Sequence, residues 1–275
     1  MKTIASRLNV RFIFPIGVSL LIIFTGCNQD SLKKSLIKKF ASPEDEAIAT
    51  NYIALLQQNK LERIENDLDA SIKTADIHDT LAKMSAMIPP QDPVSVKVVG
   101  AWQNTNIKPD FHTINLTFEY QFPSKWLLIN VATKKKDGVS TIIGFNVYPL
   151  SDSLENLNKF TLAGKNFLQY ATLALAFLIP LLTLYALVLC ILTKVEKRKW
   201  LWIIFILIGV GKLTVNWATG QWNFAPLSFQ LFGAGSFAPP YGAWLISISL
   251  PLGAIMFLFQ RKKLVASVEQ VNPAS

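Results

Sequence analysis

The side chains that most often bind metals or carry out catalysis are scarce in this chain, which has two histidines and two cysteines in 275 residues. His78 lies in the run Asp76-Ile77-His78-Asp79, whose acids are placed to cap a helix N-terminus, and His112 lies where a strand begins. A metal site needs further ligands at matching spacing, and the sequence offers none. It also contains no nucleophile–base motif. We therefore expect no metal, no cofactor and no enzymatic activity.

A second group of residues carries a charge into an apolar stretch. The run Gly209-Val210-Gly211-Lys212 has the residue types of a phosphate-binding loop but lacks its spacing. Lys212, with Asn216 one helical turn further on, is instead a candidate polar site within the membrane, of the kind that marks a pathway or a partner. Lys212 is also about 9 Å from the end of its predicted helix, so its side chain can reach the surface. We favour this second interpretation, because no intramembrane acid is present to form a relay.

Three apolar stretches, at 166–193, 200–218 and 242–260, predict transmembrane helices. Residues 194–199 and 261–275 would then be a cytoplasmic loop and a cytoplasmic tail. Residues 219–241 form an uncharged exterior loop with six aromatic side chains: Trp222, Phe224, Phe229, Phe232, Phe237 and Tyr241. We expect this loop to rest at the membrane surface as an aromatic belt, with a docking surface or a re-entrant segment as the alternative.

The N-terminus has the pattern of a secretory signal at 1–26, with three basic residues followed by an apolar stretch. The run Phe24-Thr25-Gly26-Cys27 resembles the bacterial lipobox, although that motif usually has leucine where this chain has Phe24. The resemblance implies a lipid attached to Cys27; the alternative is an uncleaved signal anchor. Residues 27–41 contain a basic amphipathic stretch that fits either a bilayer surface or a solvated linker.

Residues 42–150 have the pattern of a separate exterior domain. Ser42-Pro43-Glu44-Asp45 is a helix start, with serine as the N-cap and acids in the first turn. Three short helices follow and end at Pro89-Pro90. Beyond Pro93 the apolar period changes from 3.6 to 2, which predicts strands, most clearly at 113–122. We expect an α+β domain in which N-terminal helices pack on a four-stranded antiparallel sheet, joined by a linker at 151–165 to a three-helix transmembrane region.

The helical segment YIALLQQNKLERI followed by a bent antiparallel sheet resembles the nuclear transport factor two-like (cystatin-like) superfamily. The resemblance rests on the order of elements over residues 42–150. It implies a domain that often encloses a pocket between helix and sheet, and whose members bind partners, pair or, in some cases, catalyse. No catalytic residue of that superfamily matches a position in this chain.

The net charge of +9 is distributed unevenly, with +3 in residues 1–26, zero in residues 27–165 and +6 in residues 166–275. The one segment with the character of a soluble domain is therefore neutral, which argues against nucleic acid as a partner. With that domain outside, ten basic residues flank the predicted spans on the cytoplasmic side and five on the other. The positive-inside rule then places residues 27–165 on the exterior and the C-terminus in the cytoplasm.

We expect a bacterial inner-membrane lipoprotein that presents a non-enzymatic binding or interaction domain at the periplasmic surface. Its partners would be membrane lipids and a membrane or periplasmic protein. An accessory subunit of a transport or channel complex is the alternative, and a periplasmic hydrolase is the least favoured.

Overall fold

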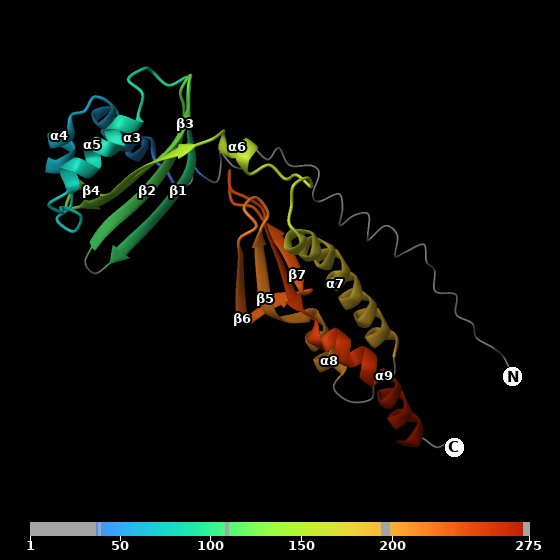
Figure 1. Ribbon diagram of the computed structural model, residues 1–275. Coiled ribbons are helices and arrows are strands. Elements are labelled where there is room, and N and C mark those ends of the chain that lie inside the picture. Colours follow the sequence, from blue (N-terminus) through green and yellow to red (C-terminus); the bar gives the residue numbers. More distant parts are fainter. Residues whose placement is uncertain (1–36, 38–39, 108–109, 194–198, 272–275) are drawn as a thin grey trace. The chain divides into compact units, whose positions relative to one another are not determined.

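The computed structural model describes residues 37, 40–107, 110–193 and 199–271 (Figure 1). The predicted signal at 1–26 and the lipid attachment at Cys27 lie outside the described residues. The chain divides into two compact units. The first comprises residues 1–90, 97–118 and 129–147, and the second comprises residues 91–96, 119–128 and 148–275.

The described part of the chain begins with three helices: α3 (Pro43–Gln57), α4 (Leu61–Asn66) and α5 (Ile77–Met87). The helix start predicted at Ser42 is confirmed, since the backbone N–H of Asp45 donates to the Ser42 hydroxyl over 3.2 Å. Asn59 adopts a left-handed conformation with φ of 55° and separates the first two helices. These short helices are stabilised by the side chains they bury rather than by their length.

Four strands follow in the order β1-β2-β3-β4: β1 (Ser95–Ile107), β2 (Asp110–Gln121), β3 (Trp126–Lys136) and β4 (Val139–Leu150). The tight turn between the last two strands is made by Asp137 and Gly138, both with positive φ, as two-residue hairpin turns require. Ile114, Leu116 and Phe118 of β2 are buried, while the residues between them are only partly covered. This sheet therefore has the polarity of a soluble domain, with its apolar side chains inside.

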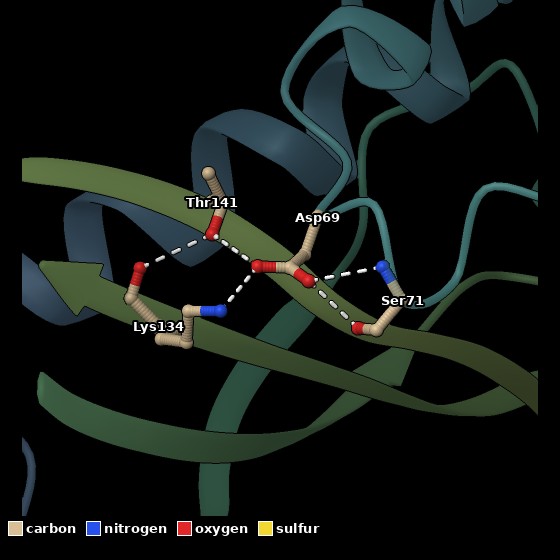
Figure 2. A network of polar contacts seen from close by, with 4 residues as sticks. All are labelled: Asp69, Ser71, Lys134 and Thr141. Atoms are coloured by element: carbon tan, nitrogen blue, oxygen red, sulfur yellow. Dashed lines mark hydrogen bonds and ion pairs between the residues drawn. The ribbon is translucent and has the colours of Figure 1, made fainter. Parts of the chain in front are cut away.

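A polar network ties the turn after α4 to this sheet (Figure 2). The Asp69 carboxylate accepts hydrogen bonds from the Ser71 backbone and hydroxyl and from Thr141 of β4, and it forms an ion pair with Lys134 of β3. Next to it, the backbone N–H of Asp69 donates to the Ile142 carbonyl over 2.8 Å. The bonds from Lys134 and Ser71 hold the pKa of Asp69 well below its usual value.

We predict that Asp69→Asn weakens this attachment by about 1–2 kcal/mol at neutral pH, because a charge-assisted ion pair is replaced by a neutral amide. Hydrogen exchange of backbone amides at 67–72 should become about tenfold faster. The folded pKa of Asp69 is depressed, so the contribution is complete above the unfolded pKa of about 3.9 and is lost as the pH falls below that value. The difference from the wild type should therefore shrink under acid conditions.

Glu44→Gln is the matched control for Asp69→Asn. It removes the ion pair that Glu44 forms with Lys135 over 2.9 Å, and both of these side chains are well exposed. Exposed pairs contribute little, so exchange at 67–72 should stay within about twofold of the wild type. Equal effects of the two substitutions, or an Asp69→Asn effect that persists at low pH, would contradict the role assigned to the network.

The second unit continues with the short helix α6 (Leu154–Leu157) and the long helix α7 (Phe167–Leu192). Beyond α7 the described elements are α8 (Lys199–Leu207), β5 (Ile208–Asn216), β6 (Trp222–Leu231), β7 (Ala234–Phe237), β8 (Leu245–Leu250) and α9 (Leu252–Val271). The strands form a second antiparallel sheet in the order β6-β5-β8-β7. We call residues 166–261 the C-terminal unit. In it the sheet lies beside the first half of α7, and α8 and α9 lie beside the second half (Figure 1).

The predicted fold class, one four-stranded sheet with a three-helix transmembrane region, is wrong. Among the described residues there are two four-stranded sheets, and α7 is the one helix long and apolar enough to cross a membrane. The stretch 200–218 changes from helix to strand after Leu207, the stretch 242–260 begins with strand β8, and the predicted loop 219–241 contains β6 and β7. Two causes are local: Gly209 and Gly211 disfavour a helix, and Ile246-Ser247-Ile248-Ser249 alternates with the period of a strand.

Candidate membrane-embedded unit

Helix α7 places its small and polar residues inside and its large apolar residues outside. Its buried side chains are Gln169, Thr172, Thr183, Ala186 and Cys190. The side chains of Phe167, Phe177, Leu178, Leu181 and Tyr185 are exposed, as are several further apolar residues of the same helix. Small and polar residues at a helix contact, with large apolar residues facing outward, are typical of helices surrounded by lipid.

Strand β6 has the same inverted polarity, with the period of two expected for a strand. Leu227, Phe229 and Leu231 are 95%, 74% and 61% exposed. Between them, Ser228 and Gln230 are partly covered. The Gln230 amide donates to the Ser247 hydroxyl and accepts from the Ser249 hydroxyl, each over 2.8 Å. Gln230 and the two serines of β8 thus satisfy one another, while the apolar side chains of this half of β6 face outward, opposite to the arrangement in β2.

Close packing requires glycine at two positions, one between strands and one between the sheet and α7. The sheet curls so that Gln230 of β6 reaches β8, although β5 lies between these strands in the sheet. A Cβ on Gly209 would lie 2.7 Å from the Ser249 Cβ, and one on Gly233 would lie 2.7 Å from the Ile179 Cγ2 of α7. The turn between β6 and β7 is therefore packed against the middle of α7.

The outer edge of β6 is interrupted halfway along. The register of β5 against β6 shifts between Val210 and Lys212, where Gly211 has a φ of 70°. Opposite this bulge lies Pro226, which has no N–H to donate, and the Ser228 hydroxyl donates to the Ala225 carbonyl over 2.8 Å. These features reduce the number of unpaired backbone groups at an edge that would otherwise be open.

One end of the C-terminal unit is fixed by an aromatic and amide cluster around Trp217, which is 1% exposed. Its ring stacks on Phe160 with centroids 4.9 Å apart, and its Nε1 donates to the Thr161 carbonyl over 2.8 Å. The Trp217 carbonyl accepts from the Gln169 amide over 2.7 Å, and Gln169 also completes the capping box of α7 with Asn166. The cluster joins the segment before α7, the start of α7 and the end of β5.

The other end of the C-terminal unit carries cations. The Lys199 ammonium donates to the Ile191 carbonyl over 2.5 Å, and Arg261 donates to the Thr193 hydroxyl over 3.3 Å. Both cations therefore contact the last turn of α7, where the helix dipole favours positive charge. Between this end and the Trp217 cluster, the described residues contain one further charged side chain, Lys212.

The chain passes along α7 twice more, each time part helix and part strand. From Lys199 to Asn216, nine helical and nine strand residues cover about 43 Å at 1.5 and 3.3 Å per residue. The 26 residues of α7 cover about 39 Å, which exceeds the roughly 30 Å of a bilayer's hydrocarbon core. The segment α8–β5 ends at Trp217, whose carbonyl accepts from Gln169 near the start of α7. The next segment, β8–α9, starts at the same end, since the Trp217 backbone N–H donates to the Trp244 carbonyl.

Lys212 and Asn216 are not brought together as the helical interpretation required. On β5 they lie four strand residues apart, about 13 Å. Lys212 is partly covered and lies opposite Ala225, and its side chain forms no hydrogen bond or ion pair with another described residue. The Asn216 side-chain oxygen Oδ1 accepts from the backbone N–H groups of Ala218 and Thr219, so the role of this side chain is to hold the turn after β5.

The two histidines and Cys190 are also apart from one another, and Cys27 lies outside the described residues. His78 is exposed and contacts Glu65 over 2.6 Å, while the His112 ring contacts the Thr105 hydroxyl over 3.0 Å. Cys190 is fully buried among the apolar residues between α7, α8 and α9. In the parts of the chain that the structure describes, no group of three or more potential metal-ligating side chains comes together.

Sequence reasoning missed a buried carboxylate. Glu119 belongs to the face of β2 predicted to be solvated, yet it is 1% exposed and one carboxylate oxygen accepts from the Leu154 N–H of α6 over 2.6 Å. Its other oxygen has no partner among the described residues. The period of two holds from Ile114 to Phe118, but nothing in the sequence shows that α6 covers Glu119. The network of Gln230, Ser247 and Ser249 was missed as well, because hydropathy averaged over a long stretch hides the alternation of polar and apolar residues inside that stretch.

Comparison with protein-family models, with curated proteins and with solved structures gives no match for this chain.

Proposed function

We propose that the chain is a bacterial inner-membrane protein whose C-terminal unit lies in the lipid bilayer and holds the α+β domain at the exterior surface for binding a partner. The observation that carries the proposal is the inverted polarity of α7 and β6. Exposed leucine and phenylalanine side chains are unfavourable in water and favourable in hydrocarbon, whereas the covered threonine, serine and glutamine side chains are shielded from hydrocarbon. So many exposed large apolar side chains on two elements are uncommon on a soluble monomer.

The ends of the C-terminal unit support an orientation. The Lys199 and Arg261 end is cationic, and the sequence adds Lys194, Lys197, Arg198, Lys262 and Lys263 to the same flanks. The positive-inside rule assigns this end to the cytoplasm. The aromatic cluster of Trp217 with Phe160 and Tyr170 then lies at the exterior interface, where amphipathic rings are favoured. A lipid on Cys27 would be a second anchor on that side.

Binding rather than catalysis is supported by the surface of the α+β domain. The end strand β1 exposes Trp102, a residue type enriched in the energetic centres of protein interfaces. An accessory role in a transport or channel complex is less favoured, because Lys212 and Asn216 do not form a joint polar site.

We predict that the full chain resists extraction from membranes by alkaline carbonate. Alkaline phosphatase fused after residue 150 should be active, and the same enzyme fused after residue 197 should be inactive. Release by carbonate would contradict the proposed membrane embedding. An inactive fusion after residue 150 would contradict the orientation but not the embedding, so the two parts of the proposal fail separately.

A further inference from the structure

An apolar groove with a volume of about 720 Å³ lies on the outside of the C-terminal unit. Its walls are Leu201, Trp202, Ile204 and Phe205 of α8, Ile208 and Val210 of β5, and Phe229 of β6. Leu201, Ile204 and Phe229 are exposed, so the groove is open along its length. Every lining residue has an aliphatic or aromatic side chain, so a flexible apolar chain would meet an almost wholly apolar wall there.

Two of the lining residues are close in the chain to a cation of the C-terminal unit. Leu201 and Trp202, in the first turn of α8, lie two and three residues after Lys199. The Trp202 ring also contacts Phe257 of α9 at 5.7 Å between centroids, and Arg261 lies one helical turn beyond Phe257. Among the described residues from 166 to 261 no acidic side chain is present, and the one acid in this stretch of the sequence is Glu196.

This arrangement, with positive charge at the end of an apolar groove, complements a molecule with an anionic head and a hydrocarbon tail. A second copy of the chain fits the charge less well, because a side-by-side copy in the same orientation would bring the same cations to the same level and repel. We propose that the groove binds an anionic phospholipid, with one acyl chain along α8 and β5 and the phosphate head group at Lys199 and Arg261. The inference rests on the proposed membrane function, since it requires this end of the unit to meet lipid head groups.

The test uses the full-length protein in detergent and native mass spectrometry. Phosphatidylglycerol and phosphatidylcholine with identical acyl chains are added in equal amounts. We expect about tenfold more bound phosphatidylglycerol than phosphatidylcholine, because the head group forms charge-assisted bonds with two cations. The preference should fall towards parity in 0.5 M NaCl, as expected for electrostatic recognition.

Two variants separate the groove from the cations. Ile204→Trp fills the groove and should lower phosphatidylglycerol binding about tenfold, whereas Leu184→Trp, at a similarly exposed site on α7, should not change it. Lys199→Gln combined with Arg261→Gln should abolish the preference between the two lipids. The thermal midpoint of each variant is measured alongside, and the salt titration of the wild type keeps the test decisive if the double variant does not fold.

Equal binding of the two lipids by the wild type would overturn the head-group assignment, and unchanged binding by Ile204→Trp would overturn the groove. Either result can occur in a protein that resists carbonate extraction, so failure of this inference is distinguishable from failure of the proposed membrane function.

Discussion

Replacing Gly253 by alanine is expected to separate α9 from α8 and to destabilise the C-terminal unit by about 3 kcal/mol. A Cβ at this position would lie 1.9 Å from the Phe205 carbonyl oxygen and 2.7 Å from the Ile206 nitrogen. Both are backbone atoms, so no side-chain rotation relieves the overlap. One of the two helices must shift by about 1 Å or more before the contact becomes tolerable.

The shift would open the core between the helices. Ala186, Cys190, Ile206, Ala254 and Phe257 are buried there against one another. The measurement is the thermal unfolding midpoint of the full-length protein in detergent, together with the fraction that remains monodisperse on gel filtration. Gly100→Ala is the control, because the nearest atom to its new Cβ lies at an ordinary contact distance of 3.4 Å. A Gly253→Ala variant as stable as Gly100→Ala would contradict the described packing of α8 and α9.

The second large effect is expected for Trp217→Ala, at about 3–5 kcal/mol. This substitution removes a fully buried ring, its stack on Phe160 and its bond to the Thr161 carbonyl. The segment before α7 then loses its attachment to the end of β5. Trp217→Phe keeps a ring for stacking but loses the indole N–H, so it should cost less, about 1–2 kcal/mol.

Trp222→Ala provides the matched control for Trp217→Ala. Trp222 is the same residue type, five positions further on, and it is 63% exposed at the start of β6. Its loss should change the thermal midpoint in detergent by less than a quarter of the Trp217→Ala effect, because little burial is removed. Comparable effects of the two substitutions would mean that Trp217 does not organise this end of the unit.

The local signals of the α+β region were recoverable from the sequence, because each depends on neighbours in the chain. Ser42 caps a helix by bonding to a residue three positions away, and Asp137-Gly138 forms a turn whose geometry is set by those two residues. The role of Asp69 was not predictable in this way. Its partners Lys134 and Thr141 lie 65 and 72 positions away, and the fold alone brings them together.

The error in the C-terminal unit has a different cause. An apolar window of about 19 residues measures how strongly a stretch prefers lipid but not whether it is a helix or a strand. The alternation of Ile246 to Ser249 and of Leu227 to Leu231 carries the strand period. In the second of these segments it is inverted, because Ser228 and Gln230 are more covered than the leucines and phenylalanine beside them. For the same reason, the sequence predicts a surface loop for the exposed residues Leu227 and Phe229, which instead lie in a strand that returns towards the middle of α7.

In the proposed function, the apolar side chains of β6 face lipid. Spin labels along this strand test this arrangement. Single cysteines at Leu227, Ser228, Phe229, Gln230 and Leu231 are labelled with a nitroxide in the full chain, with Cys27 and Cys190 replaced by alanine, and the protein is reconstituted in bilayers. If β6 faces lipid, we expect high accessibility to molecular oxygen at 227, 229 and 231 and low accessibility at 228 and 230. A water-soluble nickel complex should have little access to any of the five positions. High accessibility to the nickel complex at 227, 229 and 231, or the absence of a period of two, would contradict it.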